Sequence, residues 1–206
     1  MSPRVVSLVP SFTETLRAWG LDPVACTQYC EQPDLPTVGG TKNPDVDAIV
    51  ALAPDLVLVD VEENRRPDAE ALMAAGIEVF VSEVTSLDDV GPTMQRLAQR
   101  LDLSPDRARF DVASRAELTR RAFVPIWRRP WMALGPRTYG STVLEALGIG
   151  NVLTEVDGAY PEVDLDEIAR RAPDVVLVPS EPYVFSDDHL RELESIAPVL
   201  RLDGQD

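Results

Sequence analysis

The sequence is poor in the residues that build covalent frameworks, metal sites and membrane spans. Two cysteines and one histidine occur in 206 residues, too few for a disulfide scaffold or a histidine-rich metal site. No apolar run approaches the roughly 20 residues that cross a bilayer. We therefore expect a protein that is not embedded in a membrane and holds no metal ion of its own.

Positive charge is also scarce. Lysine and arginine number 19 against 35 aspartates and glutamates, a net charge of -16, which argues against nucleic acid or an anionic bilayer as partner. The first residues lead directly into the apolar run 5–9, without the basic start and long apolar stretch of a signal peptide. The chain as written is expected to be cytoplasmic. A mature form that has lost its leader would instead be periplasmic or extracellular.

Short apolar runs alternate with helical patterns along the chain. The expected strands are 5–9, 21–26, 55–59, 79–81, 131–134, 175–178 and 199–202. The expected helices are 12–19, 45–52, 66–75, 141–147, 165–171 and 189–196. Ser11 and Glu14 have capping-box spacing at the first of these helices. Strands rich in valine, leucine and isoleucine that alternate with helices indicate parallel sheets covered on both faces.

A helical connector is expected in the middle of the chain. Apolar residues recur at helical spacing over 86–101, and Ser104-Pro105 begins a further helical stretch toward residue 122. The predicted fold class is therefore α/β, with two Rossmann-like lobes of parallel sheet, a long helical connector and a ligand cleft between the lobes. The predicted domains are an N-terminal lobe 1–85, the connector 86–125 and a shortened C-terminal lobe 126–206.

An internal repeat supports the two lobes. Segment 46–59 aligns without a gap with segment 165–178, and eight of the fourteen positions are identical, including Asp47 with Asp166. One interpretation is convergence on a common helix, Pro-Asp turn and strand. The favoured one is two lobes of similar construction, and open α/β sheets bind ligands beyond the carboxyl ends of their strands.

Several separated motifs carry a family resemblance. They are Arg4-Val-Val-Ser-Leu-Val-Pro-Ser-Phe-Thr-Glu14, Thr37-Val-Gly-Gly40, Gly148-Ile-Gly-Asn-Val152 and the two repeated segments. In this order they resemble the helical-backbone substrate-binding proteins, which receive cobalamin, siderophores or haem, with the cobalamin type closest in pattern. The resemblance implies two α/β lobes joined by one long helix and a stiff cleft for one small molecule.

The resemblance also implies site residues. Two aromatic positions of the cobalamin pocket fall on Tyr29 and Tyr160, whereas two tryptophan positions fall on Thr41 and Asp60. A flat corrinoid needs apolar surface for stacking, so these replacements imply an altered pocket. The acids that such proteins present to arginines of an ABC permease fall on Asp47 and Asp166. The alternative for both acids is a first-turn interaction with the helix dipole.

Further ligand-binding candidates come from the loops where strands meet helices. They are Ser11, Lys42, Arg137 and Tyr139, because polar and aromatic groups at a helix start suit an anionic ligand. Segment 127–132 adds two tryptophans and two arginines, which suit a planar anion. Its alternative is a core tryptophan flanked by solvent-facing arginines.

No constellation for catalysis accompanies these signals. The chain has no Gly-x-Ser-x-Gly elbow, phosphate-binding loop or dinucleotide fingerprint. We expect a solute-binding protein, not an enzyme, that holds a corrinoid, haem-like tetrapyrrole or ferric chelate as ligand and has no intrinsic cofactor. A cytosolic carrier or sensor, an interaction module and, less favoured, a small-molecule enzyme remain as alternatives. Cys26 and Cys30 are free thiols, a disulfide or ligand contacts, and His189 is expected on a surface helix.

Overall fold

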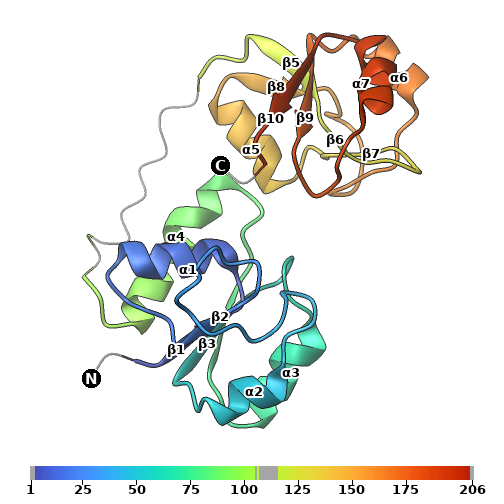
Figure 1. The fold of residues 1–206 in the computed structure, drawn as a ribbon. Coiled ribbons are helices and arrows are strands. Elements are labelled where there is room, and N and C mark those ends of the chain that lie inside the picture. The colour runs from blue at the N-terminus through green and yellow to red at the C-terminus, as the bar shows by residue number, and fades with distance from the viewer. Residues whose placement is uncertain (1–2, 105, 107–115, 205–206) are drawn as a thin grey trace. The chain divides into compact units, whose positions relative to one another are not determined.

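The computed structural model describes residues 3–104, 106 and 116–204 (Figure 1). The chain divides into two compact units. Unit 1 comprises Met1–Val84 with Gly91–Phe110, and unit 2 comprises Thr85–Val90 with Asp111–Asp206. The α/β fold class with parallel sheets in two lobes is confirmed, while the ligand cleft and the exact domain limits stay predictions.

Unit 1 is a four-stranded parallel sheet in the order β2-β1-β3-β4. Its strands are β1 (Val5–Ser7), β2 (Ala25–Cys26), β3 (Leu56–Asp60) and β4 (Val79–Ser82). Its helices are α1 (Pro10–Ala18), α2 (Val46–Ala51), α3 (Arg66–Ala74) and α4 (Leu87–Arg100), and α4 has its first residues in unit 2.

The sheet of unit 1 is covered on both faces. Successive side chains of a strand point to opposite faces, so Leu56 and Leu58 of β3 pack with residues of α1 and α4. Val57 and Val59 of the same strand pack with residues of α2 and α3. These two apolar layers hold the carboxyl ends of the strands at one edge of the sheet.

Unit 2 repeats this topology with a sheet in the order β8-β5-β9-β10. Its strands are β5 (Arg120–Phe123), β8 (Ile149–Asn151), β9 (Val175–Pro179) and β10 (Val199–Leu202). Its helices are α5 (Tyr139–Ala146), α6 (Leu165–Arg170) and α7 (Asp187–Glu194). An antiparallel pair, β6 (Pro125–Trp127) and β7 (Met132–Ala133), lies between β5 and α5 in the chain.

The two repeated segments are α2 with β3 and α6 with β9, and their likeness extends to hydrogen bonds. The Asp55 carboxylate accepts from the Arg4 backbone N–H at 2.7 Å, and the Asp174 carboxylate accepts from the Arg121 N–H at 2.7 Å. Each arginine side chain also donates to a carbonyl at the C-terminal end of the helix that precedes the aspartate, Leu52 after α2 and Arg171 after α6. The same tie therefore joins the first and third strands of both sheets.

Two expectations about the middle of the chain are wrong. The helix α4 ends at Arg100, and Arg120–Phe123, expected within a helical connector, is the strand β5 at the centre of the second sheet. Residues 105 and 107–115 of that connector lie outside the described residues. Segment 131–134 is also not the first strand of the second sheet, because only Met132–Ala133 is a strand and it pairs with β6. Pairing with β8 and β9, rather than local periodicity, decides the conformation of β5.

The capping expectation is wrong for Ser11. Helix α1 begins at Pro10 after Val9, with no side-chain cap, because proline at the first helical position needs no N–H partner. A capping box occurs instead at α7, where His189 Nδ1 accepts from the Ser186 N–H at 3.2 Å and Ser186 Oγ accepts from the His189 N–H. His189 thus fixes a helix start, half-buried among aromatic rings.

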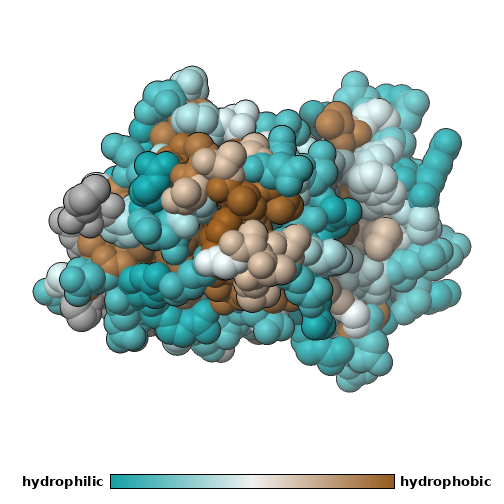
Figure 2. Space-filling model, turned by 90° about the horizontal axis from the view of Figure 1, so that it is seen from below, coloured by the Kyte–Doolittle hydropathy of each residue, from teal (hydrophilic) through white to brown (hydrophobic). Residues whose placement is uncertain are grey.

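Most of the surface drawn in Figure 2 is hydrophilic, interrupted by hydrophobic patches. The large hydrophobic side chains with the greatest exposure include Val184, Leu147, Tyr29, Leu118, Val61 and Leu200. Among the described residues no helix combines the length and the apolar character that a membrane span needs.

Candidate functional site

A buried polar network lies at the carboxyl end of β3 in unit 1. Asp60 is only 8% exposed. Its carboxylate accepts from Ser82 Oγ at 2.6 Å and from the Glu62 backbone N–H at 2.9 Å, and its own N–H donates to Asn64 Oδ1 at 2.8 Å. Buried polar groups of this kind need internal partners. Asp60 has one in Ser82, the last residue of the neighbouring strand β4, and two in the turn that follows β3.

Asn64 extends this network to the loop after β2. Its Nδ2 donates to the carbonyl of Leu8 at 3.1 Å and to that of Thr41 at 3.0 Å. Thr41 is also buried. The structure therefore links Thr41 and Asp60 through Asn64, as parts of a buried scaffold at the strand ends. Their predicted contacts with a ligand stay predictions.

Exposed candidates lie on the same loops. Tyr29 is 59% exposed, and a Cβ built on Gly40 would lie 3.0 Å from its Cε2, so the absence of a side chain at Gly40 makes room for the ring. Lys42 Nζ donates to the carbonyl of Glu62 just beyond β3. Ser11 is exposed on α1, where its carbonyl accepts from Thr15 Oγ1. Unit 1 thus carries an exposed ring and a cation near its strand ends.

The two cysteines lie beneath this loop as buried free thiols. The sulfur of Cys30 is 3.2 Å from Thr13 Oγ1 and 3.4 Å from Thr27 Oγ1. Burial, reinforced by the neighbouring Cys30, raises the pKa of the Cys26 thiol to about 12. Cys26 is therefore protonated at neutral pH, and the free-thiol alternative is the one that the structure contains.

In unit 2, a second buried network positions the loop before α5. The carbonyl of Gly135 accepts from Thr138 Oγ1 at 2.8 Å and from Ser141 Oγ at 2.7 Å. A Cβ on Gly135 would lie 2.3 Å from the carbonyl oxygen of Gly158, so only glycine lets the loop around residue 158 approach this closely.

The two loops that meet at Gly135 and Gly158 carry candidate ligand-binding residues. The Arg137 guanidinium pairs with the Asp157 carboxylate at 3.0 Å on the exposed surface. Tyr139 begins α5, and Tyr160 follows Asp157 in the next loop, both with exposed rings. Arg137 thus faces an acid within the chain, but a pair this exposed contributes little to stability, so the predicted contact of Arg137 with an anion stays a prediction.

Two aromatic residues lie at the carboxyl end of the second sheet: Trp127, from the candidate segment 127–132, and Tyr183, which the sequence analysis did not single out. Trp127 ends β6 with 43% exposure, and its ring meets that of Tyr183 edge-to-face at a centroid distance of 5.1 Å. Tyr183 follows β9 by four residues and packs on Phe185 at 4.8 Å. The signal for Tyr183 was its place in a Pro-Tyr-Val-Phe run just after a buried strand.

The docking candidates occupy equivalent places. Asp47 and Asp166 are each the second residue of a six-residue helix, exposed to solvent. The preceding caps are Asp45, which accepts from the Ala48 N–H, and Asp164, which accepts from the Asp166 N–H. Within the described part of the chain, neither Asp47 nor Asp166 has an ion pair. Their role in docking stays a prediction.

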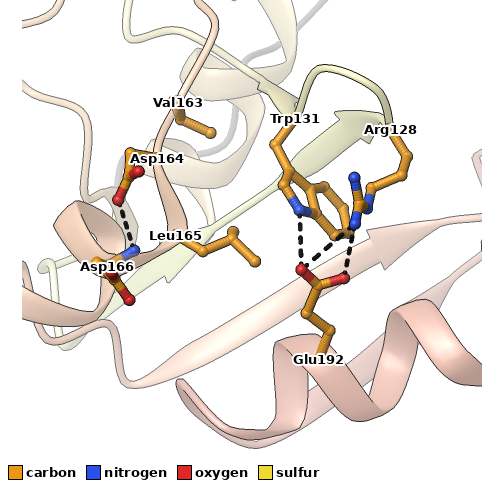
Figure 3. Close-up of a pocket in the computed structure, with 7 residues that line it drawn as sticks. All are labelled: Arg128, Trp131, Val163, Asp164, Leu165, Asp166 and Glu192. Carbon is orange, nitrogen blue, oxygen red and sulfur yellow. Dashed lines mark hydrogen bonds and ion pairs between the residues drawn. The ribbon is translucent and has the colours of Figure 1, made fainter.

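An open groove of about 260 Å³ lies beside Asp166 (Figure 3). Its lining is Arg128, Trp131, Val163, Asp164, Leu165, Asp166 and Glu192. The Arg128 guanidinium lies 4.6 Å above the Trp131 ring and pairs with Glu192 at 3.1 Å, and the indole Nε1–H points to the same carboxylate at 3.4 Å. Segment 127–132 thus holds a core tryptophan, as its alternative interpretation said, with Arg128 engaged at the rim.

The described residues contain no group of three or more histidine, cysteine, aspartate or glutamate side chains arranged to hold a metal ion.

Comparison with known proteins places this geometry in a family. Residues 5–197 match the family model described as periplasmic binding protein. The vitamin B12-binding protein of Vibrio parahaemolyticus is 26% identical over 96% of this chain and 78% of its own length. That of Yersinia pestis is 28% identical over 85% of this chain and 69% of its own.

Solved structures share the fold. The periplasmic haem-binding protein HutB of Vibrio cholerae superposes with a TM-score of 0.80 at 20% identity, covering 98% of this chain and 90% of that one. The vitamin B12-binding protein BtuF of the same organism gives 0.72 at 20% identity, covering 97% and 88%. The resemblance drawn from the sequence motifs is confirmed, and the chain belongs to the periplasmic binding protein family.

Proposed function

We propose that the protein is the solute-binding component of an ABC importer and that its cargo is a corrinoid, a haem-like tetrapyrrole or a ferric chelate. The observation that carries this cargo class is the exposed Trp127 ring, supported edge-to-face by Tyr183 at a strand end of unit 2. Large planar ligands gain most from such rigid aromatic faces. The names of the relatives, which bind vitamin B12 or haem, point to the same class.

Unit 1 supplies complementary chemistry. Tyr29 offers a second exposed ring and Lys42 a cation that suits propionate, phosphate or carboxylate groups of such a ligand. The buried Asp60 network holds these loops rigid, and preorganised contacts lose less entropy on binding. We expect binding without catalysis, because the relatives are binding proteins.

Asp47 and Asp166 are proposed as the docking acids for the permease, in keeping with their exposure and equivalent placement. A chain in this role works outside the cytoplasm. Cargo binding by a chain that no permease recognises would favour a carrier or sensor instead.

The experiment is a thermal-shift screen of the full chain with hydroxocobalamin, cobinamide, haemin and ferric chelates. One class is expected to raise the melting temperature in proportion to the logarithm of its concentration, because a ligand that binds only the native state stabilises it. Trp127→Ala is expected to weaken binding at least tenfold and Trp127→Phe much less.

Leu147→Ala is the matched control. Leu147 is also exposed and apolar, but it follows the last residue of α5 and precedes the amino end of β8, whereas Trp127 lies near the carboxyl ends of the strands. The absence of any shift at saturating concentrations would reject the cargo class. Equal losses in the Trp127 and Leu147 variants would reject the aromatic contact.

A further inference from the structure

Lys42 stands at the tip of a tight turn in unit 1. The Gly40 N–H donates to the Asn43 carbonyl and the Asn43 N–H to the Gly40 carbonyl, both at 3.3 Å. The exposed Lys42 side chain crosses from this turn to the one after β3, where its Nζ donates to the carbonyl of Glu62. A long lysine stem loses much rotamer freedom when it is held in one place. The ammonium is therefore fixed only if both turns are fixed.

The Asn64 side chain joins these two turns. Its Oδ1 accepts from the Asp60 N–H at 2.8 Å, and the Asn64 N–H donates back to the Asp60 carbonyl at 2.9 Å. Its Nδ2 donates at 3.0 Å to the carbonyl of Thr41, the residue before Lys42, and at 3.1 Å to that of Leu8. One buried amide thus holds both the turn on which the lysine rests and the backbone from which it starts.

Only an amide of this length meets all the hydrogen-bonding groups at this site. One backbone N–H finds its acceptor in Asn64, and the carbonyls of Leu8 and Thr41 find donors. A carboxylate offers no donor and a hydroxyl offers one. A substitution at Asn64 therefore frees the Thr41 carbonyl, and with it the base of the lysine.

Unit 2 uses a buried asparagine in the same manner. Asn151 Oδ1 accepts from the Leu153 N–H at 2.9 Å, and its Nδ2 donates to the Leu134 carbonyl and the Ser141 hydroxyl, each at 2.8 Å. This asparagine ends β8, whereas that of unit 1 follows β3. The single lysine of the chain belongs to unit 1. Asn151 therefore offers a control with the same hydrogen bonding and no lysine to position.

We propose that Asn64 is a positioning residue for anionic cargo: it sets where Lys42 presents its ammonium group. One of the three Nζ–H groups donates to the Glu62 carbonyl, and no ion pair of the described residues involves Lys42. The other N–H groups suit a propionate, phosphate or carboxylate. The inference rests on the proposed function, which supplies the cargo, and adds that this cargo carries an anionic group.

The first test needs no cargo. Reductive methylation of the full chain with ¹³C-formaldehyde labels two amines, Lys42 Nζ and the N-terminus. A pH titration separates them because an α-amino group loses its proton at a lower pH than lysine. NMR relaxation of the methyl groups then measures how firmly the ammonium is held. In the native chain the Lys42 methyl groups are expected to be less mobile than those of a methylated lysine in a short peptide.

Asn64→Ala removes all three side-chain hydrogen bonds, and Asn64→Ser keeps a hydroxyl for one of them. Both variants are expected to raise the mobility of the Lys42 methyl groups to the value of the short peptide. Asn151→Ala is the matched control for this measurement and is expected to leave the Lys42 signal unchanged. Unchanged mobility in the Asn64 variants, or an equal rise in Asn151→Ala, would overturn the positioning role.

The second test compares haemin with its neutral dimethyl ester, which differ only in their anionic groups. Lys42→Met is expected to weaken haemin about two- to fivefold, the range for an exposed ion pair, and Asn64→Ser by no more than that. The double variant is expected to match Lys42→Met alone, because coupled residues are not additive. The affinity for the ester is expected to be the same in all of them.

Equal losses for haemin and its ester would show that Asn64 is merely structural, as would losses that add in the double variant. Either result overturns the proposal. Failure of the native chain to bind haemin would instead reject haem as the cargo in the proposed function. The methyl relaxation still decides the part played by Asn64 in that case, because it is measured without a ligand.

Discussion

Units 1 and 2 have the same strand order and the same tie between first and third strands, yet their strand ends are built from different chemistry. At the end of β3, Asp60 anchors a buried polar network. The residue in register at the end of β9 is Pro179, and the nearby surface is formed by aromatic rings. The shared parts hold the sheets together, and the parts that differ lie at the strand ends, where we propose that the ligand makes contact.

The largest expected effect tests whether aligned residues of the two repeated segments contribute alike to stability, as they do to geometry. Ile49 and Ile168 are aligned in the repeat and fully buried in their own cores. Either substitution by alanine should cost about 2–5 kcal/mol through lost burial and a residual cavity. Hydrogen exchange should show Ile49→Ala weakening β3 and Ile168→Ala weakening β9. Equal loss of protection in both strands from one substitution would mean that the units are a single cooperative block.

The next prediction sharpens the difference at the strand ends. Asp60→Ala removes the acceptor of the Glu62 N–H and leaves the Ser82 hydroxyl only its longer contact of 3.2 Å to the Val59 carbonyl, which should cost about 1–3 kcal/mol. Pro179 is half-buried and has no N–H to lose, so Pro179→Ala, the matched change in unit 2, should cost less, about 0.4–1 kcal/mol from the greater freedom of the unfolded chain. Urea unfolding of both variants gives the comparison. A Pro179 variant as unstable as the Asp60 variant would contradict it.

A smaller effect should be identical in the two units. Ala53 and Ala172 occupy the same turn of the repeat with φ of 45° and 50°, a region that strains any residue with a Cβ. Glycine relieves this strain but is more flexible when unfolded. Ala53→Gly and Ala172→Gly should therefore each stabilise the protein by about 0.5 kcal/mol. Melting temperatures that move in opposite directions would show that the turns are not equivalent.

The smallest expected effect is on acid sensitivity. Hydrogen bonds from Arg17 lower the pKa of Asp34 below its ordinary 3.8, and those from Arg100 lower that of Glu78 below 4.5. A carboxyl whose pKa is depressed by folding stabilises the native state above its unfolded pKa, and this contribution fades as the pH falls through the folded value.

Both pairs belong to unit 1. Asp34→Asn and Glu78→Gln should therefore flatten the loss of stability of unit 1 below pH 4.5, measured by unfolding at a series of pH values. Asp89, whose pKa is lowered chiefly by Ser86, groups with unit 2 and provides the matched variant Asp89→Asn. An unchanged acid slope in all three variants would rule out this origin.

Sequence patterns predicted the elements with dense apolar runs and missed those that depend on distant partners. The strands β3 and β9 are continuous buried runs and were found to within a residue. The strand β5 begins with two arginines and is fixed by pairing with β8 and β9. Local periodicity carries no record of such pairing.

The residues of the candidate site also divide into those that the sequence predicts and those that depend on distant partners. Exposed rings such as Tyr29 follow from motif position, because a residue just past a strand end lies at the edge of the sheet. The burial of Asp60 could not be predicted, since it depends on Ser82, 22 residues away, whose hydroxyl donates to the carboxylate, and on Asn64, whose Oδ1 accepts from the Asp60 N–H. The open side of the groove depends likewise on a turn between two short strands.

The insertion between β5 and α5 is closed at its base by a backbone hydrogen bond from the Leu134 N–H to the carbonyl of Val124 at 2.9 Å. Because its two ends already meet, other segments can be grafted there without stretching the sheet. Any replacement must keep a ring where Trp131 stacks on Phe185, or the layer beneath is exposed to water. This position is therefore a natural entry point for engineering a new recognition loop, with the rest of the scaffold unchanged.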